Sequence, residues 1–223
     1  MQAYSLTNTW ELAWSAFKRH WLVGVLLSVL YPFAGFIPIV GNVAVLILSL
    51  FHTVYGLKAW NKSEPITFQD ITSESFTTYL KMFLGVLLNF LPILIAVLIS
   101  LPQLTELNAK AQEELISPET ILAQILDFLT ILLIAGLFSI LIVAALFAYP
   151  YFVLDKKMDV FTAIQHSLRF FTDNILRVFL FLITSWLINA LGMLICCIGL
   201  FLTIPISSIA AAGVYKQLVD RTV

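Results

Sequence analysis

The longest uncharged apolar stretch in the first half of the chain runs from Trp21 to Leu57. A helix needs about 20 apolar residues to cross a hydrocarbon core of about 30 Å, so this stretch is nearly long enough for two crossings. Its middle contains Pro32, Gly35, Pro38 and Gly41, residues that favour a tight turn between two helices over the interior of one. The stretch therefore predicts a transmembrane hairpin with spans at about 21–35 and 40–57.

The remaining apolar runs predict four more crossings. They lie at about Met82–Leu101, Ile121–Ala148, 176–194 and 199–216. Charged residues make up only 11% of the chain, against about 25% in a soluble domain, so most of the surface must face lipid. We expect an all-α polytopic membrane protein, with residues 1–223 forming a single transmembrane domain of six helices arranged as three hairpins.

The positions of the basic residues predict the orientation of the spans. The chain has 12 Lys and Arg residues. Apart from Lys110, all of them fall on one side of the six-span arrangement, at Lys18, Arg19, Lys58, Lys62, Lys81, Lys156, Lys157, Arg169, Arg177, Lys216 and Arg221. Short cytoplasmic loops retain Lys and Arg. We therefore predict a multi-pass protein of the cell inner (plasma) membrane with both termini in the cytoplasm.

A helical pattern precedes each hairpin and suggests three repeat-like units, at about 5–60, 66–120 with 121–150, and 155–218. In the first unit Trp10, Trp14, Phe17 and Trp21 share one helix face, and Asn8 with Glu11 resembles a capping box. In the last unit Phe161, Ile164, Leu168, Phe171 and Ile175 repeat this spacing. In the middle unit Thr67 and Asp70 are the predicted cap of a weaker helix.

These amphipathic segments are expected to form cytoplasmic helices in the headgroup plane, each leading into a hairpin. Lys18, Arg19 and His20 then stand where such a helix turns down into the bilayer. Two roles share this pattern: the helices either pack beneath the bundle as a collar or sense lipid.

Basic residues of the last unit form a candidate site for a lipid headgroup. The residues are Lys156, Lys157, His166, Arg169 and Arg177. A basic residue near an anionic leaflet contributes about 1 kcal/mol to membrane attraction, so anionic membrane lipids are the candidate partners. The alternative is that these residues only follow the positive-inside rule.

Polar residues inside the predicted spans are few. His52, Asn42, Asn89 and Asn189 are the candidates for a polar path. His52 is either linked to proton movement or a hydrogen-bonding group facing the bundle, and intramembrane asparagines commonly join helices. Asp127 is expected at the outer mouth of the fourth span, in water.

Several functional classes lack their sequence signatures. The chain has no catalytic motif such as G-x-S-x-G and no Gly-rich phosphate loop. Its only cysteines, Cys196 and Cys197, are adjacent in an apolar run and are expected to be buried thiols. We predict no catalytic residues, no metal site, no cofactor and no nucleic-acid partner.

The segment YPYFVLDKKMDVFTAIQHSLRFFTDNILRVFLFL and the later ICCIGLFLTIPISSIAAAGVYKQL carry a family resemblance. With the W-x-x-A-W-x-x-F-K opening at Trp10, they resemble the YciC-like bacterial integral membrane proteins and the related membrane domain of some glycerophosphodiester phosphodiesterases. The matching positions are Pro150, Asp155, Ala163, Ser167, Asn174, Gly199, Pro205 and Tyr215. The resemblance implies a polytopic bacterial inner-membrane protein with a role in lipids or the envelope. It implies no phosphodiesterase activity, because the catalytic domain of that enzyme has no counterpart in these residues.

Three functions remain open from the sequence. The first is a non-enzymatic protein that organises, senses or helps to move lipid-like molecules at the cytoplasmic leaflet. The second is a small transporter or channel for a small solute, functioning as a homo-oligomer. The third, an enzyme acting on lipids, has the least support because acid–base pairs are missing.

Overall fold

The computed structural model describes residues 4–35, 40–112, 118–195 and 198–222, and every regular element within them is an α-helix. The helices are α1 (Leu6–Gly35), α2 (Val40–Asn61), α3 (Phe68–Thr72), α4 (Phe76–Leu88), α5 (Leu91–Gln112), α6 (Pro118–Ala145), α7 (Tyr149–Asp155), α8 (Val160–Leu194) and α9 (Leu200–Thr222). The prediction of an all-α protein is confirmed.

Four segments of the described chain are long and apolar enough to cross a membrane. They are Val43–Asn61, Leu122–Asp155, Val160–Leu194 and Leu200–Val219, and α4 with α5 makes a fifth if the pair is one bent crossing. Helix α1 does not join this set because Lys18, Arg19 and His20 lie in its middle, leaving only Trp21–Gly35 as its apolar part.

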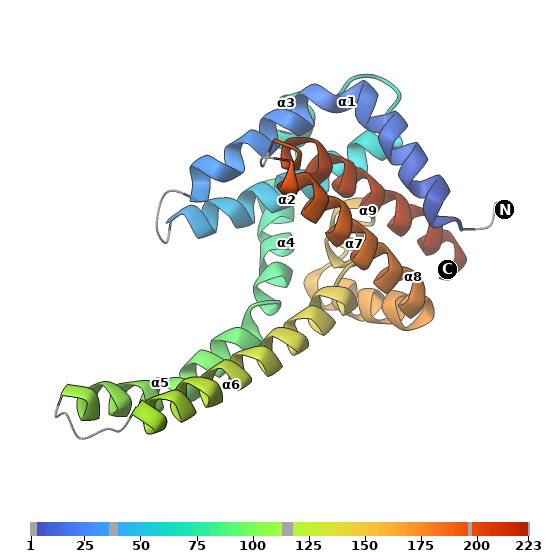
Figure 1. Ribbon diagram of the computed structural model, residues 1–223. Coiled ribbons are helices and arrows are strands. Elements are labelled where there is room, and N and C mark those ends of the chain that lie inside the picture. The colour runs from blue at the N-terminus through green and yellow to red at the C-terminus, as the bar shows by residue number, and fades with distance from the viewer. Residues whose placement is uncertain (1–3, 36–39, 113–117, 196–197, 223) are drawn as a thin grey trace. The chain divides into compact units, whose positions relative to one another are not determined.

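The sequence predicted that an amphipathic helix and the span after it are separate helices. Two of these predicted separations differ in the structure. Helix α1 continues through Lys18–His20 as one helix (Figure 1), because neither Pro nor Gly occurs there to interrupt it. Helix α8 likewise joins the predicted amphipathic segment to the fifth span, but with a kink at Asn174, where φ is −134° and ψ is 24°. Of these two helices, only α8 changes direction between its amphipathic segment and its span, and it does so at Asn174.

The helix starts are set by side-chain caps, one of them at an unexpected residue. The capping box of Thr67 and Asp70 is confirmed. The prediction of a cap at Asn8 is wrong: α1 begins at Leu6, and the Asn8 backbone N–H donates to Ser5 Oγ at 3.3 Å. Serine is as good a cap as asparagine. With the cap at Ser5 instead of Asn8, the helix begins about one turn earlier. Asp159 caps α8 by accepting from the N–H groups of Phe161 and Thr162.

Two helix boundaries in the middle of the chain also differ from expectation. The predicted third span is interrupted at Asn89 and Phe90, between α4 and α5, because Pro92 has no N–H to donate to the Leu88 carbonyl and its ring would clash with that carbonyl in a continuous helix. Helix α5 then continues past Pro102 to Gln112. The residues after Pro102 are mostly good helix formers, so the helix persists despite one missing hydrogen bond.

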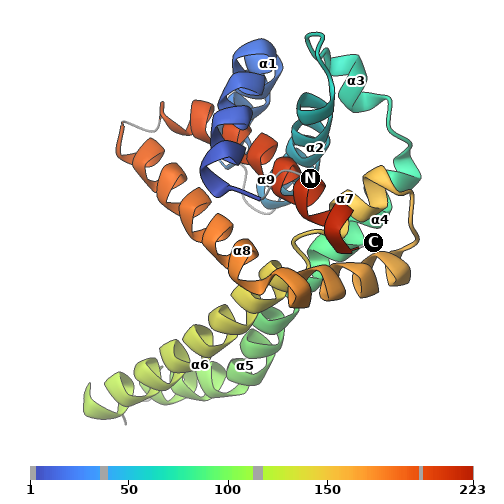
Figure 2. The same ribbon diagram turned by 90° about the vertical axis from the view of Figure 1, so that its right-hand side faces the viewer.

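The chain forms two compact units, of which the first comprises Met1–Gly85 and Ala144–Val223. Helix α9 lies at its centre, against α1, α2 and α8 (Figures 1 and 2). Lipid tails compete with apolar side chains for contact, so close helix packing in membranes depends on small residues. The sequence SSIAAAG at 207–213 supplies them on α9. A Cβ on Gly56 of α2 would overlap the Ser208 carbonyl oxygen, so the α2 and α9 backbones are in direct contact.

The short helix α7 belongs to the same unit and is almost entirely buried, with Tyr149, Tyr151, Phe152, Val153 and Leu154 all in the core. Tyr151 stacks on Tyr215 of α9 with ring centroids 5.1 Å apart, and Phe152 meets Tyr215 edge-on at 5.3 Å. These aromatic contacts fix the end of α7, and therefore Asp155, against α9.

The second unit, Val86–Val143, contains α5 and most of α6. The two helices run alongside each other in both views (Figures 1 and 2). Small residues one turn apart are buried on each helix, Ala96 and Ser100 on α5 and Ala135 and Ser139 on α6. Most of the large apolar side chains of this unit are exposed, as expected of helices whose surroundings are lipid.

Candidate functional site

A pocket of about 300 Å³ lies among the helices of the first unit. Its polar side comes from α1, α2, α8 and α9, and its apolar side includes aromatic rings. The lining residues are Tyr31, Ser49, His52, Thr53, Phe147, Tyr151, Phe181, Leu182, Ser185, Asn189, Ile204, Ser207, Ser208 and Ala211. We call this the central pocket.

His52 is fixed in the wall of the central pocket by hydrogen bonds on both ring nitrogens. Nδ1 lies 3.1 Å from the Leu48 carbonyl oxygen, and Nε2 lies 3.1 Å from Ser28 Oγ. A backbone carbonyl can only accept, so Nδ1 carries a hydrogen. The Ser28 hydroxyl has a single hydrogen, which points either to Nε2 or to the Gly24 carbonyl oxygen 3.0 Å away. Both ring nitrogens thus lie against groups of the bundle, which fits the hydrogen-bonding role among the two that the sequence left open.

Asn189 has a spare hydrogen-bond acceptor. Its Nδ2 donates to the Ser185 carbonyl at 2.9 Å and to Ser207 Oγ at 3.2 Å. Its Oδ1 is buried, and no partner for it occurs in the part of the chain that the structure describes. An unsatisfied buried polar atom costs about 1–3 kcal/mol, so this oxygen would gain from a ligand that donates a hydrogen bond.

The lining of the central pocket also includes aromatic rings. Phe147, in the turn between α6 and α7, lies with its ring centroid 5.5 Å from that of Phe181 and 6.1 Å from that of Tyr151. Most of the lining side chains are half-buried, so the pocket opens to the surface of the unit. The pocket thus offers both hydrogen-bonding groups and aromatic rings to one ligand.

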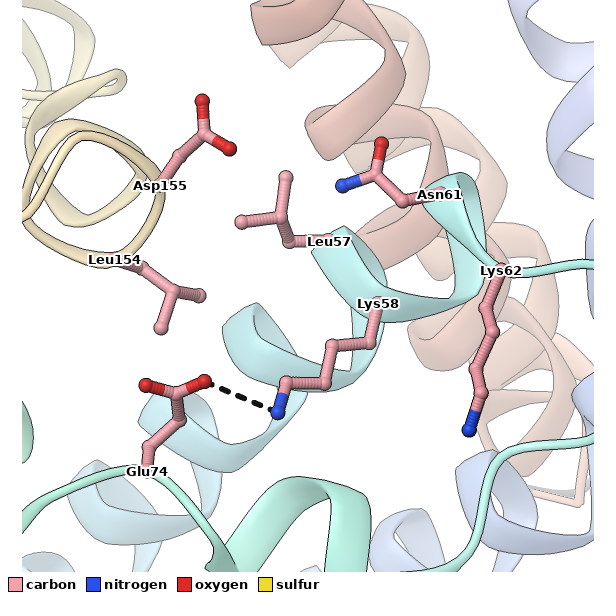
Figure 3. A pocket seen from close by; sticks show the side chains of 7 residues that line it. All are labelled: Leu57, Lys58, Asn61, Lys62, Glu74, Leu154 and Asp155. Atoms are coloured by element: carbon pink, nitrogen blue, oxygen red, sulfur yellow. Dashed lines mark ion pairs between the residues drawn. The ribbon is translucent and has the colours of Figure 1, made fainter.

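A second pocket, of about 340 Å³, is lined by charged residues. Figure 3 shows its side chains, which come from the end of α2, the segment after α3 and the end of α7: Leu57, Lys58, Asn61, Lys62, Glu74, Leu154 and Asp155. Glu74 accepts from Lys58 at 3.0 Å and from Lys157 at 2.9 Å. Asp155 accepts from Lys216 at 2.7 Å and from the Tyr215 hydroxyl at 3.2 Å.

Two acids of this region, Glu74 and Asp70, have lowered pKa values, which favours their charged forms. Burial alone would raise the pKa of Glu74, but the hydrogen bonds and charges of Lys157 and Lys58 outweigh it and hold the pKa below its ordinary value. Hydrogen bonds from Thr67 and Lys62 lower the pKa of Asp70 strongly. Lys58 also donates to the Asp70 carbonyl oxygen. The cations and anions therefore neutralise each other within the fold.

The predicted lipid-headgroup residues each have a different neighbour. Lys156 lies 4.0 Å from Asp155, and Lys157 pairs with Glu74. His166 packs its ring against Phe152 at 5.6 Å. Arg169 lies 3.9 Å from Asp173, and Arg177 donates to Asn174 Oδ1 at 3.0 Å. The described contacts thus do not bring these five residues to one common partner.

The predicted polar-path residues are only partly brought together. His52 and Asn189 line the central pocket. Asn89 belongs to the second unit, where its buried Oδ1 has no partner within the described chain. The Asn42 side chain and both cysteines lie outside the described residues. Asp127 is exposed on α6.

Sequence reasoning missed Tyr31 and Ser207, which line the central pocket, and Ser28, which contacts His52. Their hydroxyls stand in mostly apolar runs, and only the packing of the helices places them together. Asp155 was noted only for the resemblance, and its ion pair with Lys216 was not foreseen. No group of three or more His, Cys, Asp or Glu residues suited to a metal ion occurs among the described residues.

Comparison with known proteins gave no match to a family model, to a curated protein or to a solved structure.

Proposed function

We propose that this chain is a non-enzymatic polytopic protein of the bacterial inner membrane that binds lipid-like molecules and organises, senses or helps to move them. The central pocket is the observation that carries the proposal. It combines hydrogen-bonding groups with aromatic rings, a combination suited to a ligand with a polar end and an apolar body. It also lies among helices with the length and composition of membrane spans.

The topology belongs to the same proposal. The six spans are α1 from Trp21 onward, α2, the bent pair α4–α5, α6, α8 from the Asn174 kink and α9, with both termini in the cytoplasm. The distribution of Lys and Arg supports this orientation. The apolar part of α1 is short, and its span would require local thinning of the bilayer or tilted neighbours.

The amphipathic segments are proposed to lie against lipid. The face of α8 that packs on the core consists of Ala163, Ser167, Phe170 and Asn174. The apolar face noted in the sequence is a different one: Phe161 is 78% exposed, and Leu168 and Ile175 are also exposed. On α1 the face is divided: Trp14 and Trp21 are exposed, whereas Phe17 is buried. A collar would bury these faces, whereas an interfacial helix leaves them free for the headgroup region. The resemblance to the YciC-like proteins supports the same class of function.

Native mass spectrometry of the purified protein tests the proposal. The protein is extracted in mild detergent, and the bound lipids are identified after ejection from the intact complex. We expect a lipid of defined mass to remain bound, and to be lost when Ser185→Leu and Ser208→Leu fill the central pocket. Leu182→Met, which keeps the volume of a lining side chain, is the matched control. If no lipid-like molecule stays bound to the wild-type chain, the proposal is wrong.

A small-solute transporter or channel is the second candidate, because His52 and Asn189 line one pocket and His52 is at the middle of its apolar segment. Solute-binding sites of transporters lie near the bilayer midplane. This function predicts solute flux in proteoliposomes that Asn189→Leu reduces, with no bound lipid needed. An oligomer of the chain would show directly in the same mass spectra.

A further inference from the structure

The described lining of the central pocket carries no charged residue. Its polar atoms are hydroxyl oxygens, one imidazole and one carboxamide. His52 already uses both ring nitrogens inside the bundle. A phosphate or carboxylate brought here would meet no Lys or Arg, and burying an uncompensated ion costs several kcal/mol or more. The pocket therefore selects against anionic headgroups.

The depth of the central pocket strengthens this selection. His52 is the central residue of the 19-residue segment Val43–Asn61, about 14 Å of helix from either end at ~1.5 Å per residue. Ser208 is likewise near the middle of Leu200–Val219. Half of a hydrocarbon core is about 15 Å. His52 and Ser208 are thus near the midplane of the proposed membrane, where charge is most costly.

Asn189 lines the pocket, and its buried Oδ1 has no partner within the described chain, so the carboxamide would gain a hydrogen bond by turning this oxygen toward a donor on the ligand. An ammonium group is a donor, but the described lining provides no carboxylate to balance its charge. A hydroxyl donates without charge, and its own oxygen can accept from a neighbouring Ser or Thr hydroxyl of the lining. A hydroxyl is therefore the donor that this pocket suits best.

Size and access limit the ligand further. The volume of about 300 Å³ is at the lower end of ligand pockets, which span about 300–1,000 Å³. A small polar end and the first carbons of a chain fit, but two full acyl chains do not. Exposed apolar residues flank Ser185 and Asn189 on α8, with Ile183 52% and Trp186 69% exposed. That helix surface suits hydrocarbon, so the remainder of an amphiphile can stay in lipid.

From these features we propose that the central pocket binds the uncharged, hydroxyl-bearing end of its ligand, with the Asn189 carboxamide turning its Oδ1 toward the pocket to accept from a hydroxyl. The chemistry is that of a small neutral alcohol or polyol, supplied either by a neutral glycerolipid such as diacylglycerol or by a free polyol such as glycerol. The lipid source rests on the proposed function; the free polyol would serve the transporter alternative.

Photoaffinity labelling in nanodiscs tests the inference. The full chain is reconstituted with phosphatidylcholine and either a diazirine-bearing diacylglycerol or the matching phosphatidic acid, and labelled peptides are mapped. We expect diacylglycerol to label the α8 segment around Leu182–Asn189, and phosphatidic acid to label it weakly. Asn189→Leu should lower the diacylglycerol labelling about five- to tenfold, the equivalent of one hydrogen bond of about 1–1.5 kcal/mol.

Asn89→Leu is the matched control, because Asn89 also has a buried, unpartnered Oδ1 but does not line the central pocket. It should leave the labelling unchanged. If Asn189→Leu fails to fold, as judged by gel filtration, Ser207→Ala takes its place, since it removes the hydroxyl that orients the Asn189 amide.

The outcomes separate this inference from the proposed function. Equal pocket labelling by diacylglycerol and phosphatidic acid would overturn the selection for an uncharged hydroxyl while leaving lipid binding in place. Glycerol flux in proteoliposomes that Asn189→Leu reduces, without lipid labelling, would support the hydroxyl chemistry and overturn the lipid source. Absence of both labelling and flux would overturn the inference altogether.

Discussion

Replacing Gly56 by alanine tests the central packing contact of the first unit. The new Cβ would overlap the Ser208 carbonyl oxygen and lie 2.6 Å from the Ser208 carbonyl carbon. Both are backbone atoms in the middle of α9, so no change of rotamer can relieve the overlap, and α2 must move away from α9. Overpacking of this kind costs about 1–3 kcal/mol, and a backbone clash belongs at the upper end of that range.

Alanine also improves the helix itself, by about 1 kcal/mol relative to glycine. The net loss for Gly56→Ala is then about 2 kcal/mol. For a chain of this length about 1 kcal/mol corresponds to ~2–4 °C, so we expect the melting temperature to fall by about 4–8 °C. The assay is thermal unfolding in a mild detergent, followed by intrinsic tryptophan fluorescence.

Two other glycines provide a graded series. A Cβ on Gly136 of α6 would meet nothing within 4 Å, so Gly136→Ala should leave the melting temperature unchanged or raise it slightly. A Cβ on Gly213 would meet the ring of Trp60, 2.5 Å from Cη2, and a side chain can shift where a backbone cannot. Gly213→Ala should fall between the other two. If Gly56→Ala melts at the temperature of Gly136→Ala, the α2 and α9 backbones are not in contact.

Acidification should lower stability in two steps, because the folded-state pKa values of His20 and Glu74 both lie below their unfolded ones. For His20, burial is the main cause. Each contribution is full above the unfolded pKa and is lost as the pH falls, below 6.5 for His20 and below 4.5 for Glu74. His20→Gln and Glu74→Gln should each remove one step from melting curves recorded across pH, and unaltered curves would contradict the assignment. Lys157 has a left-handed φ of 55°, so Lys157→Gly should be about 1 kcal/mol more stable than Lys157→Ala in thermal unfolding, since both lose the ion pair and only glycine relieves the strain; equal stabilities would argue against strain. In a chain without its native cysteines, a cysteine replacing Ser73 should resist an impermeant maleimide in intact cells while one replacing Thr105 should react, and the opposite pattern would invert the proposed topology.

The features that the sequence predicted correctly are local ones. The helices follow the apolar runs, and the Thr67–Asp70 capping box lies where its spacing put it. Both properties depend on residues within one or two turns of each other. The errors at Asn8 and at Pro102 are local too: in each case another residue or the surrounding helix formers outweighed the feature that was noted.

The features that could not be predicted depend on contacts between distant segments. Glu74 and Lys157 form an ion pair although 83 residues separate them, and no periodic pattern relates the two positions. The central place of α9 follows from the small side chains at 207–213, but the sequence contains other stretches with small residues. Of the predicted polar-path residues, His52 and Asn189 line the same pocket because α2 and α8 both pack against α9.

The two pockets differ in a way that favours a neutral ligand over an anionic one. At the helix ends, the lysines that could bind an anion already form ion pairs with acids of the protein. Glu74 pairs with Lys58 and Lys157, and Asp155 pairs with Lys216. An anionic headgroup would have to displace a carboxylate from these pairs, and the exchange of one anion for another yields little free energy in partly exposed sites. In the central pocket the buried Asn189 oxygen has no partner within the described chain, so a hydroxyl donor that reaches it gains a hydrogen bond without displacing a charged group. The free energy gained on binding is therefore larger for a hydroxyl donor at the unused acceptor of the central pocket than for an anionic headgroup at the paired lysines.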